Sequence, residues 1–232
     1  MLMRGKNCRF TALLILICLS ACAAGVFASP LSGKIIVLDP GHGAKNSKGQ
    51  IVNSGCRSKS GVRELDKTVV IAGILGGELG QRGTTVYFTR DAANFWRRAE
   101  SQDEDNRGRA EFANSKHADL FLRIHCNWSP HKKQRGVLVL WYKDGSKKIA
   151  DAVFEAIKKT GVRTEGVRRQ YLVGFRFAEV PAILIEYGYL SSREDEKLLN
   201  NDEYIKKISD GAASGLEKYF SETGAAAEKR GE

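Results

Sequence analysis

The amino-acid sequence predicts an α/β fold: a single domain with a mostly parallel, twisted central sheet and helices on both faces. Three observations support this prediction. Short apolar runs alternate along the chain with segments whose apolar residues recur at helical spacing. About 200 residues follow an N-terminal leader, which is enough for one domain with a full core. No internal repeat is visible. Strands that alternate with helices in this way form a sheet sandwiched between helices.

The first half of the domain begins with an apolar run, which ends in a turn and predicts a buried strand. The loop that follows is rich in Gly, Ser, Lys and Asn. The next segment has apolar residues at helical spacing and stops at Gly83. In chain order, we expect a strand, a loop, a helix, a strand, a polar loop or short helical piece, a helix and a strand over residues 34–40, 44–62, 64–83, 84–90, 91–106, 107–116 and 118–125.

The second half contains the clearest amphipathic helix, which Ser146 caps at its start and Gly161 ends. Two apolar runs beside it predict strands, and two further segments predict closing helices. In chain order, we expect a strand, a helix, a strand and two helices over residues 136–142, 146–161, 182–188, 192–200 and 202–220. The low-complexity residues 221–232 are expected to be a flexible tail.

The N-terminal residues 1–28 have the features of a secretory signal peptide. A basic start precedes a short apolar stretch and then small residues, and the stretch is too short for a convincing membrane span. Two cleavage sites remain open. The sequence LSAC resembles a lipobox, in which Cys22 becomes the lipidated first residue, and VFA at residues 26–28 resembles an ordinary cleavage site. The protein is therefore expected to be exported to the periplasm or cell envelope, with a membrane tether if Cys22 is lipidated.

The chain is basic, with 37 Lys and Arg against 27 Asp and Glu and a net charge of +10. Such a charge suits a polyanionic partner, which can be nucleic acid, anionic lipid or an acidic cell-wall polymer. Nucleic acid is not expected, because the basic residues are scattered and the protein is exported.

Several groups with metal-binding chemistry fall at the ends of predicted strands. His42, His125 and Glu186 each follow an apolar run, and Glu64 opens the first long helix. In α/β sheets, ligands bind beyond the carboxyl ends of the strands. Two imidazoles and a carboxylate with a fourth position open form a catalytic zinc site. The alternative is two separate histidines that bond to backbone or carboxylate neighbours.

Five segments carry a resemblance to a known family: LDPGHG, GVRELDKTVVIA, TRD, RAEFANSKHADLFLRIHCN and VPAILIEYGYLSSREDEKLL. Their order and spacing are similar to those of the zinc-dependent N-acetylmuramoyl-L-alanine amidases of the type-3 family, which are cell-wall hydrolases. The resemblance covers about residues 33–220, which we expect to be the catalytic domain. It implies that His42, Glu64 and His125 bind Zn²⁺ and that Glu186 is the catalytic acid and base.

By the same resemblance, the substrate is bacterial peptidoglycan and the bond cut is the amide between N-acetylmuramic acid and L-alanine. Zinc activates water and polarises a carbonyl, and a carboxylate outside the coordination sphere can transfer the proton. Two other functions remain open. The chain could be a zinc peptidase acting on stem peptides, or a non-catalytic wall-binding protein on the same fold.

The sequence RIHCN departs from the family pattern at Arg123 and Cys126. Strand alternation places Arg123 on the same face as His125, where a buried charge needs a partner. Arg123 is therefore expected to pair with a site carboxylate or to bind a carboxylate of the stem peptide. The alternative is that strand twist carries it to a solvated edge.

Three smaller questions also concern the site. Cys56 and Cys126 are either two unpaired thiols or a disulfide, and alternation points Cys126 away from the ligand face. Asp39 either fixes the tautomer of His42 or stabilises the turn. About sixty residues separate His125 from Glu186, too few for the plugging helix that some relatives insert. An open groove is therefore expected, and an activator protein remains an open alternative among the partners.

Overall fold

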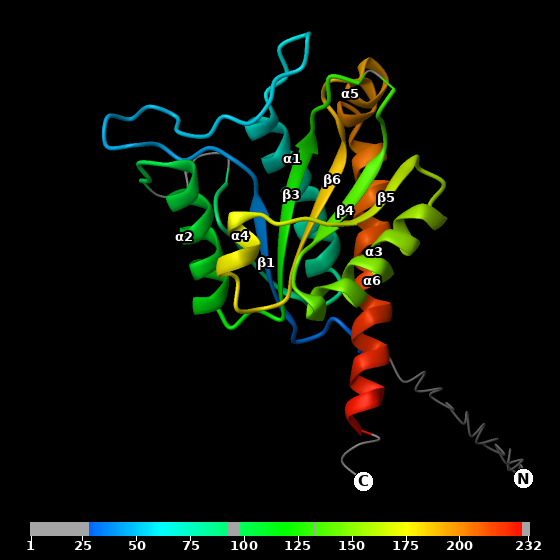
Figure 1. Cartoon of the computed structure of the whole chain (residues 1–232). Helices are drawn as coiled ribbons and strands as arrows, with labels where there is room; N and C mark the ends of the chain where they lie inside the picture. The colour runs from blue at the N-terminus through cyan, green and yellow to red at the C-terminus, as the bar shows by residue number, and fades with distance from the viewer. Residues whose placement is uncertain (1–27, 92–97, 132, 229–232) are drawn as a thin grey trace, which may run out of the picture.

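A six-stranded sheet lies at the centre of the structure, a computed structural model that describes residues 28–91, 98–131 and 133–228 (Figure 1). The strands lie in the order β2–β1–β3–β6–β4–β5. They comprise β1 (Ile35–Pro40), β2 (Thr85–Phe88), β3 (Leu120–Asn127), β4 (Val137–Trp141), β5 (Thr164–Arg169) and β6 (Ala182–Tyr189). Strands β2, β1, β3 and β6 are parallel, whereas β4 pairs antiparallel with β6 and parallel with β5. The mostly parallel α/β sheet is confirmed.

Helices cover both faces of the sheet, as predicted. One face packs against α1, α3 and α6, and the other against α2 and α4 (Figure 1). The helices comprise α1 (Glu64–Gly80), α2 (Gln102–Ser115), α3 (Lys147–Lys159), α4 (Val173–Phe177), α5 (Arg193–Leu199) and α6 (Asp202–Glu228), with a 3₁₀ turn at Asp144–Ser146 before α3.

Alternation along β3 separates the apolar core from the candidate site. Leu122, Ile124 and Cys126 belong to the core against α1, α3 and α6. Arg123 and His125 point to the opposite face, because successive side chains of a strand alternate. Cys126 therefore packs away from the ligand face, as predicted. The α2 and α4 face contains the chemically active side chains near the carboxyl ends of the strands.

Four elements differ from the sequence expectation. Helix α2 begins at Gln102, because the Ser101 hydroxyl accepts the Glu104 amide and Glu104 in turn accepts the amide of Glu100. Strand β5 and the short helix α4 had no apolar pattern strong enough to predict them. Helix α6 continues through Glu228, where a flexible tail was expected from residue 221.

The predicted signal peptide and the cysteine at position 22 lie outside the described residues, apart from residue 28. Across the described ranges, no helix combines the length and the apolar character that a membrane span requires.

Candidate metal centre

Two histidines and one glutamate converge at the carboxyl edge of the sheet. His42 lies in the turn after β1, Glu64 is the first residue of α1, and His125 lies near the end of β3. His42 has a φ of 69°, a left-handed conformation that is uncommon for a residue with a side chain. Such strained positions persist where the surrounding structure holds them, often at functional sites. The fold thus brings together the three side chains that we predicted as metal ligands.

The three ligand atoms form a small triangle. Glu64 Oε1 lies 2.9 Å from His42 Nε2 and 3.1 Å from His125 Nδ1, and the two nitrogens are 3.1 Å apart. Atoms bound at about 2.0–2.1 Å to one tetrahedral zinc ion lie roughly 3.3 Å from each other. The donor set and its spacing therefore fit a zinc ion. The alternative of two separate histidines is not compatible with this convergence.

The protonation states also favour a metal. Burial lowers the pKa of His125 to about 4, so its imidazole is neutral near pH 7 and can donate a lone pair. Burial alone would raise the pKa of Glu64, but the hydrogen bonds with His125 and His42 hold it well below its usual range. Glu64 is also held in place by the amides of Cys56 and Cys126, at 2.9 and 3.0 Å.

Two glycines make room for this convergence. A Cβ atom at Gly41 would lie 2.3 Å from Cε1 of His125. A Cβ atom at Gly55 would lie 2.6 Å from Oε2 of Glu64, and Gly55 also has a φ of 67°. Both positions therefore require glycine, because any side chain would displace a ligand.

Asn53, which sequence reasoning missed, orients His42. Its Oδ1 atom lies 2.7 Å from Nδ1 of His42, so the imidazole donates there and leaves Nε2 for a metal. The hypothesis that Asp39 has this role is wrong. Asp39 instead accepts hydrogen bonds from Thr89, Arg109 and Arg123. No sequence pattern marks Asn53, because it lies in a loop of polar residues.

Replacing Asn53 with alanine is expected to weaken zinc affinity about 10- to 100-fold, the usual cost of losing a group that orients a ligand. Competition with a fluorescent chelator would measure the affinity. Asn46→Ala is the matched control, because Asn46 lies in the same loop and bonds only within it. Unchanged affinity in Asn53→Ala would show that the hydrogen bond does not orient His42.

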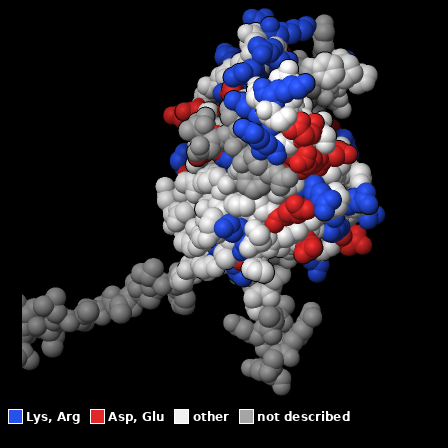
Figure 2. All heavy atoms as spheres, turned by 90° about the vertical axis from the view of Figure 1, so that its left-hand side faces the viewer, with Lys and Arg blue, Asp and Glu red and all other residues white. Residues whose placement is uncertain are grey.

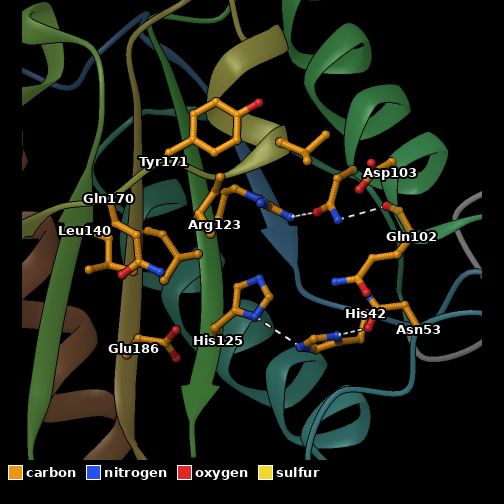
Figure 3. Close-up of a pocket in the computed structure, with 14 residues that line it drawn as sticks. His42, Asn53, Gln102, Asp103, Arg123, His125, Leu140, Gln170, Tyr171 and Glu186 are labelled. Atoms are coloured by element: carbon orange, nitrogen blue, oxygen red, sulfur yellow. Dashed lines mark hydrogen bonds between the residues drawn. The ribbon is translucent and has the colours of Figure 1, made fainter.

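Glu186 lies beside the three ligands and outside their triangle. It pairs in register with His125 on the neighbouring strand, and its carboxylate points toward His125 (Figure 3). Its Oε2 atom is buried and has no hydrogen-bond partner within the described chain. Burial, with the nearby charge of Glu64, raises the pKa of Glu186 well above its usual range. A carboxyl group with a raised pKa can hold a proton that an ordinary carboxyl group would lose.

A pocket of about 270 Å³ connects these groups to solvent (Figure 3). We call it the metal pocket. Its lining includes His42, Asn53, Asn106, Arg123, His125 and Glu186. Helix α4 lies above the pocket and does not cover the ligands (Figure 3). The described residues therefore leave the groove open, as expected from the short connection between β3 and β6.

The sequence of residues 36–218 matches the profile of a protein family described as N-acetylmuramoyl-L-alanine amidase. The chain belongs to this family. The match covers most of the chain and all three metal-ligand candidates.

Relatives of this family member include cell-wall proteins. The probable cell wall amidase LytH of Staphylococcus epidermidis is 32% identical over 195 residues, which are 84% of this chain and 61% of the relative. The chain thus spans about three fifths of that relative's length. Amidase AmiC2 of Nostoc punctiforme has a TM-score of 0.69 and 31% identity, over 82% of this chain and 99% of that one. The CwlD amidase of Clostridioides difficile was solved in complex with the GerS lipoprotein. It has a TM-score of 0.68 and 26% identity, over 81% of this chain and 98% of the CwlD chain.

A buried ionic network supports the turn that carries His42. Arg109 of α2 donates to Asp39 at 2.7 Å, to Asp105 at 2.8 Å, and to the carbonyls of Pro40 and His42 at 2.9 and 2.6 Å. Burial would raise the pKa of Asp39, but the charges of Arg109 and Arg123 hold that pKa well below its usual range. Arg109 thus anchors helix α2 to the sheet.

Arg123 belongs to the same network. Its Nε donates to Asp39 at 2.8 Å and its Nη2 to Asn106 at 2.6 Å. The side chain is buried, so the alternative of a solvated edge is wrong. A Cβ atom at Gly174 of α4 would lie 2.5 Å from Nη1 of Arg123, which shows how closely α4 covers it. Arg123 thus has a carboxylate partner and also lines the metal pocket.

The two body cysteines are free thiols in this structure, so no disulfide joins them. The Sγ atom of Cys56 lies 3.5 Å from the carbonyl oxygen of Cys126. Burial raises the pKa of both thiols, with the nearby charge of Glu64 acting in the same direction. Both therefore remain protonated, which disfavours their oxidation and metal binding.

Proposed function

We propose that this chain is a zinc-dependent amidase that hydrolyses the bond between N-acetylmuramic acid and L-alanine in peptidoglycan. The observation that carries this proposal is the convergence of His42, Glu64 and His125, with Glu186 beside them in an open pocket. Membership of the amidase family supports the choice of bond. LytH is described as a probable cell wall amidase and AmiC2 as an N-acetylmuramoyl-L-alanine amidase, which supports a peptidoglycan substrate and an envelope location.

Zinc is the proposed cofactor, held by Nε2 of His42, Oε1 of Glu64 and Nδ1 of His125. When bound, it supplies Lewis-acid activation of a water molecule and of the amide carbonyl. A set of three protein ligands leaves a coordination position open, which is typical of catalytic zinc sites.

Glu186 is proposed to transfer the proton. In the first half of the reaction its carboxylate takes a proton from the attacking water. In the second half it returns that proton to the leaving amine nitrogen of L-alanine, which breaks the amide. The raised pKa of Glu186 suits this double role, because the proton must be accepted and then released.

Arg123 is proposed to bind a carboxylate of the stem peptide. It lines the metal pocket, and Asp39 and Asn106 fix the guanidinium at a constant place. A guanidinium that is already ordered loses little conformational entropy when it binds a carboxylate.

Basic side chains gather near one end of the molecule, over the loop between β1 and α1 (Figures 1 and 2). That loop contains Lys45, Lys48, Arg57 and Lys59. This charge suits an acidic wall polymer. An accessory protein is also proposed, since a structural neighbour was solved with a lipoprotein bound. Lipidation at Cys22 is proposed from the leader sequence alone.

Digestion of defined muropeptides, followed by mass spectrometry, tests the proposed function. We expect free glycan and peptides that begin with L-alanine. A zinc chelator should abolish the reaction, and added zinc should restore it. Shortened stem peptides that remain attached to the glycan would instead identify a zinc peptidase. No cleavage by zinc-loaded protein would support the non-catalytic wall-binding alternative.

A further inference from the structure

A second hollow adjoins the metal pocket on the other side of Glu186. It has a volume of about 250 Å³, and the two hollows share Leu140, Gln170 and Glu186 in their linings. The shared residues make one continuous groove with Glu186 near its middle. We call the second hollow the Trp128 pocket. Its remaining lining includes Asn127, Trp128, Gln134, Arg168 and Tyr189.

The Trp128 pocket combines polar walls with one exposed aromatic ring. Trp128 is 53% exposed and lies in the wall of this otherwise polar pocket. The side-chain amides of Gln134 and Gln170 have no hydrogen-bond partner within the described parts of the chain. Side-chain amides offer both donors and acceptors. The pocket is therefore built for a ligand with many hydroxyl groups and one flat apolar face.

The walls of this pocket are held in position. The hydroxyl of Tyr189 donates to Glu165, and Arg168 donates to the same carboxylate at 2.9 Å. The Trp128 amide donates to Oδ1 of Asn127 at 2.8 Å, and the Asn127 carbonyl accepts the amide of Leu190 at 2.9 Å. Trp128 thus follows directly on an anchored residue at the end of β3.

Trp128 also has a fixed place relative to the metal site. It lies three residues after the ligand His125, and β3 shifts its register against β6 between His125 and Asn127. Such an irregularity re-aims the side chains that follow it. A ligand bound on Trp128 would therefore extend past Glu186 into the metal pocket.

We propose that the Trp128 pocket binds a sugar ring of the glycan strand. The apolar face of the ring lies on the indole of Trp128, and its hydroxyl and acetamido groups bond to Asn127, Gln134 and Gln170. Sugar rings have the required combination of a hydrogen-rich flat face and polar edges, whereas an apolar amino-acid side chain would leave these amides without partners. This inference rests on the proposed function and fixes the orientation of the substrate along the groove. The glycan lies on the Trp128 side, and the stem peptide lies on the Arg123 side.

Binding of peptide-free oligosaccharides tests the sugar site without relying on catalysis. The probe is a series of GlcNAc–MurNAc oligomers from which the stem peptides have been removed, measured by titration calorimetry. Trp128→Ala is expected to weaken binding about tenfold, and Trp128→Phe much less, because a phenyl ring still offers a stacking face. Tyr87→Ala is the matched control, because Tyr87 is an exposed aromatic on β2, away from the groove. We expect it to bind like wild type.

Kinetics on two substrates give a second test. Trp128→Ala should lower kcat/KM about tenfold on a disaccharide-tripeptide and leave kcat/KM unchanged on a lactoyl-tripeptide, which has the same amide but no sugar. Equal loss on both substrates, or no loss on either, would overturn the sugar site. So would wild-type protein that cleaves the lactoyl-tripeptide but does not bind the oligosaccharides. Protein that binds the oligosaccharides through Trp128 but cleaves neither substrate would support the sugar site and overturn the amidase proposal.

Discussion

Glu186→Gln is expected to lower kcat on muropeptides about 10²- to 10⁴-fold, the range typical of a lost general acid or base. Glutamine has nearly the same shape and can still donate and accept hydrogen bonds, but it cannot carry the proton from water to the amine. Glu186 lies outside the triangle of ligand atoms, so zinc content should remain at the wild-type value. Zinc should be measured by elemental analysis on the same samples as the kinetics.

A matched control is Glu155→Gln on α3, an exposed glutamate on the helix that packs on the other face of the sheet. It should retain full activity and zinc. If Glu186→Gln kept near wild-type activity, another group would have to transfer the proton. If zinc were lost together with activity, Glu186 would be a ligand, and the division of roles among the four residues would have to be revised.

Arg109→Leu is expected to destabilise the protein by about 3–5 kcal/mol, because it removes one partner of a buried ion pair and leaves the other charge buried. Arg109 is fully buried and pairs with both Asp39 and Asp105. It also donates to the carbonyls of Pro40 and His42. Urea unfolding followed by circular dichroism would give the change in free energy.

Arg107→Leu is the control, since Arg107 lies on the same helix and forms an exposed pair with Glu111. Exposed pairs contribute about 0–1 kcal/mol, so this variant should unfold almost like wild type. Arg109→Lys tests the network if Arg109→Leu does not fold. Lysine keeps the charge but lacks the planar guanidinium group, whose several N–H donors reach two carboxylates and two carbonyls. If Arg109→Lys lowered the free energy of unfolding by less than about 1 kcal/mol, the geometry of the guanidinium group would contribute little to stability.

The metal-ligand candidates could be predicted because they obey a simple rule of α/β sheets. His42 and His125 follow apolar strands, and parallel strands end at one edge, so residues 83 positions apart meet there. Glu186 follows the same rule on β6. Its exclusion from the ligand triangle could not be predicted from the sequence, because it depends on angles between neighbouring strands. The family resemblance was needed to divide the roles.

The supporting groups were much harder to predict. Asn53 lies in a loop whose path depends on long-range contacts, and nothing distinguishes it from the other polar residues nearby. Of the two roles considered for Asp39, fixing the tautomer of His42 is wrong, because residues close in sequence need not have side chains close in space. Asp39 points into the ionic network because it lies in β1, where alternation sends its side chain toward α2.

The secondary structure that escaped prediction has polar sequences. Strand β5 (TEGVRR) lies at the edge of the sheet and exposes its arginines, so it has no continuous apolar run. Helix α4 has only five residues, too few for a helical period to be visible. Both elements nevertheless shape the groove, since β5 supplies Arg168 and α4 supplies Val173.

The chain enters the domain at the edge of the sheet opposite to the groove. Ser29 donates to Glu217 of α6 at 2.8 Å. From there the chain enters β1, which runs within the sheet from this edge to the edge where His42 lies (Figure 1). A strand of six residues spans about 20 Å. If Cys22 is lipidated, the attachment end of the domain and the metal pocket therefore lie at opposite edges of the sheet.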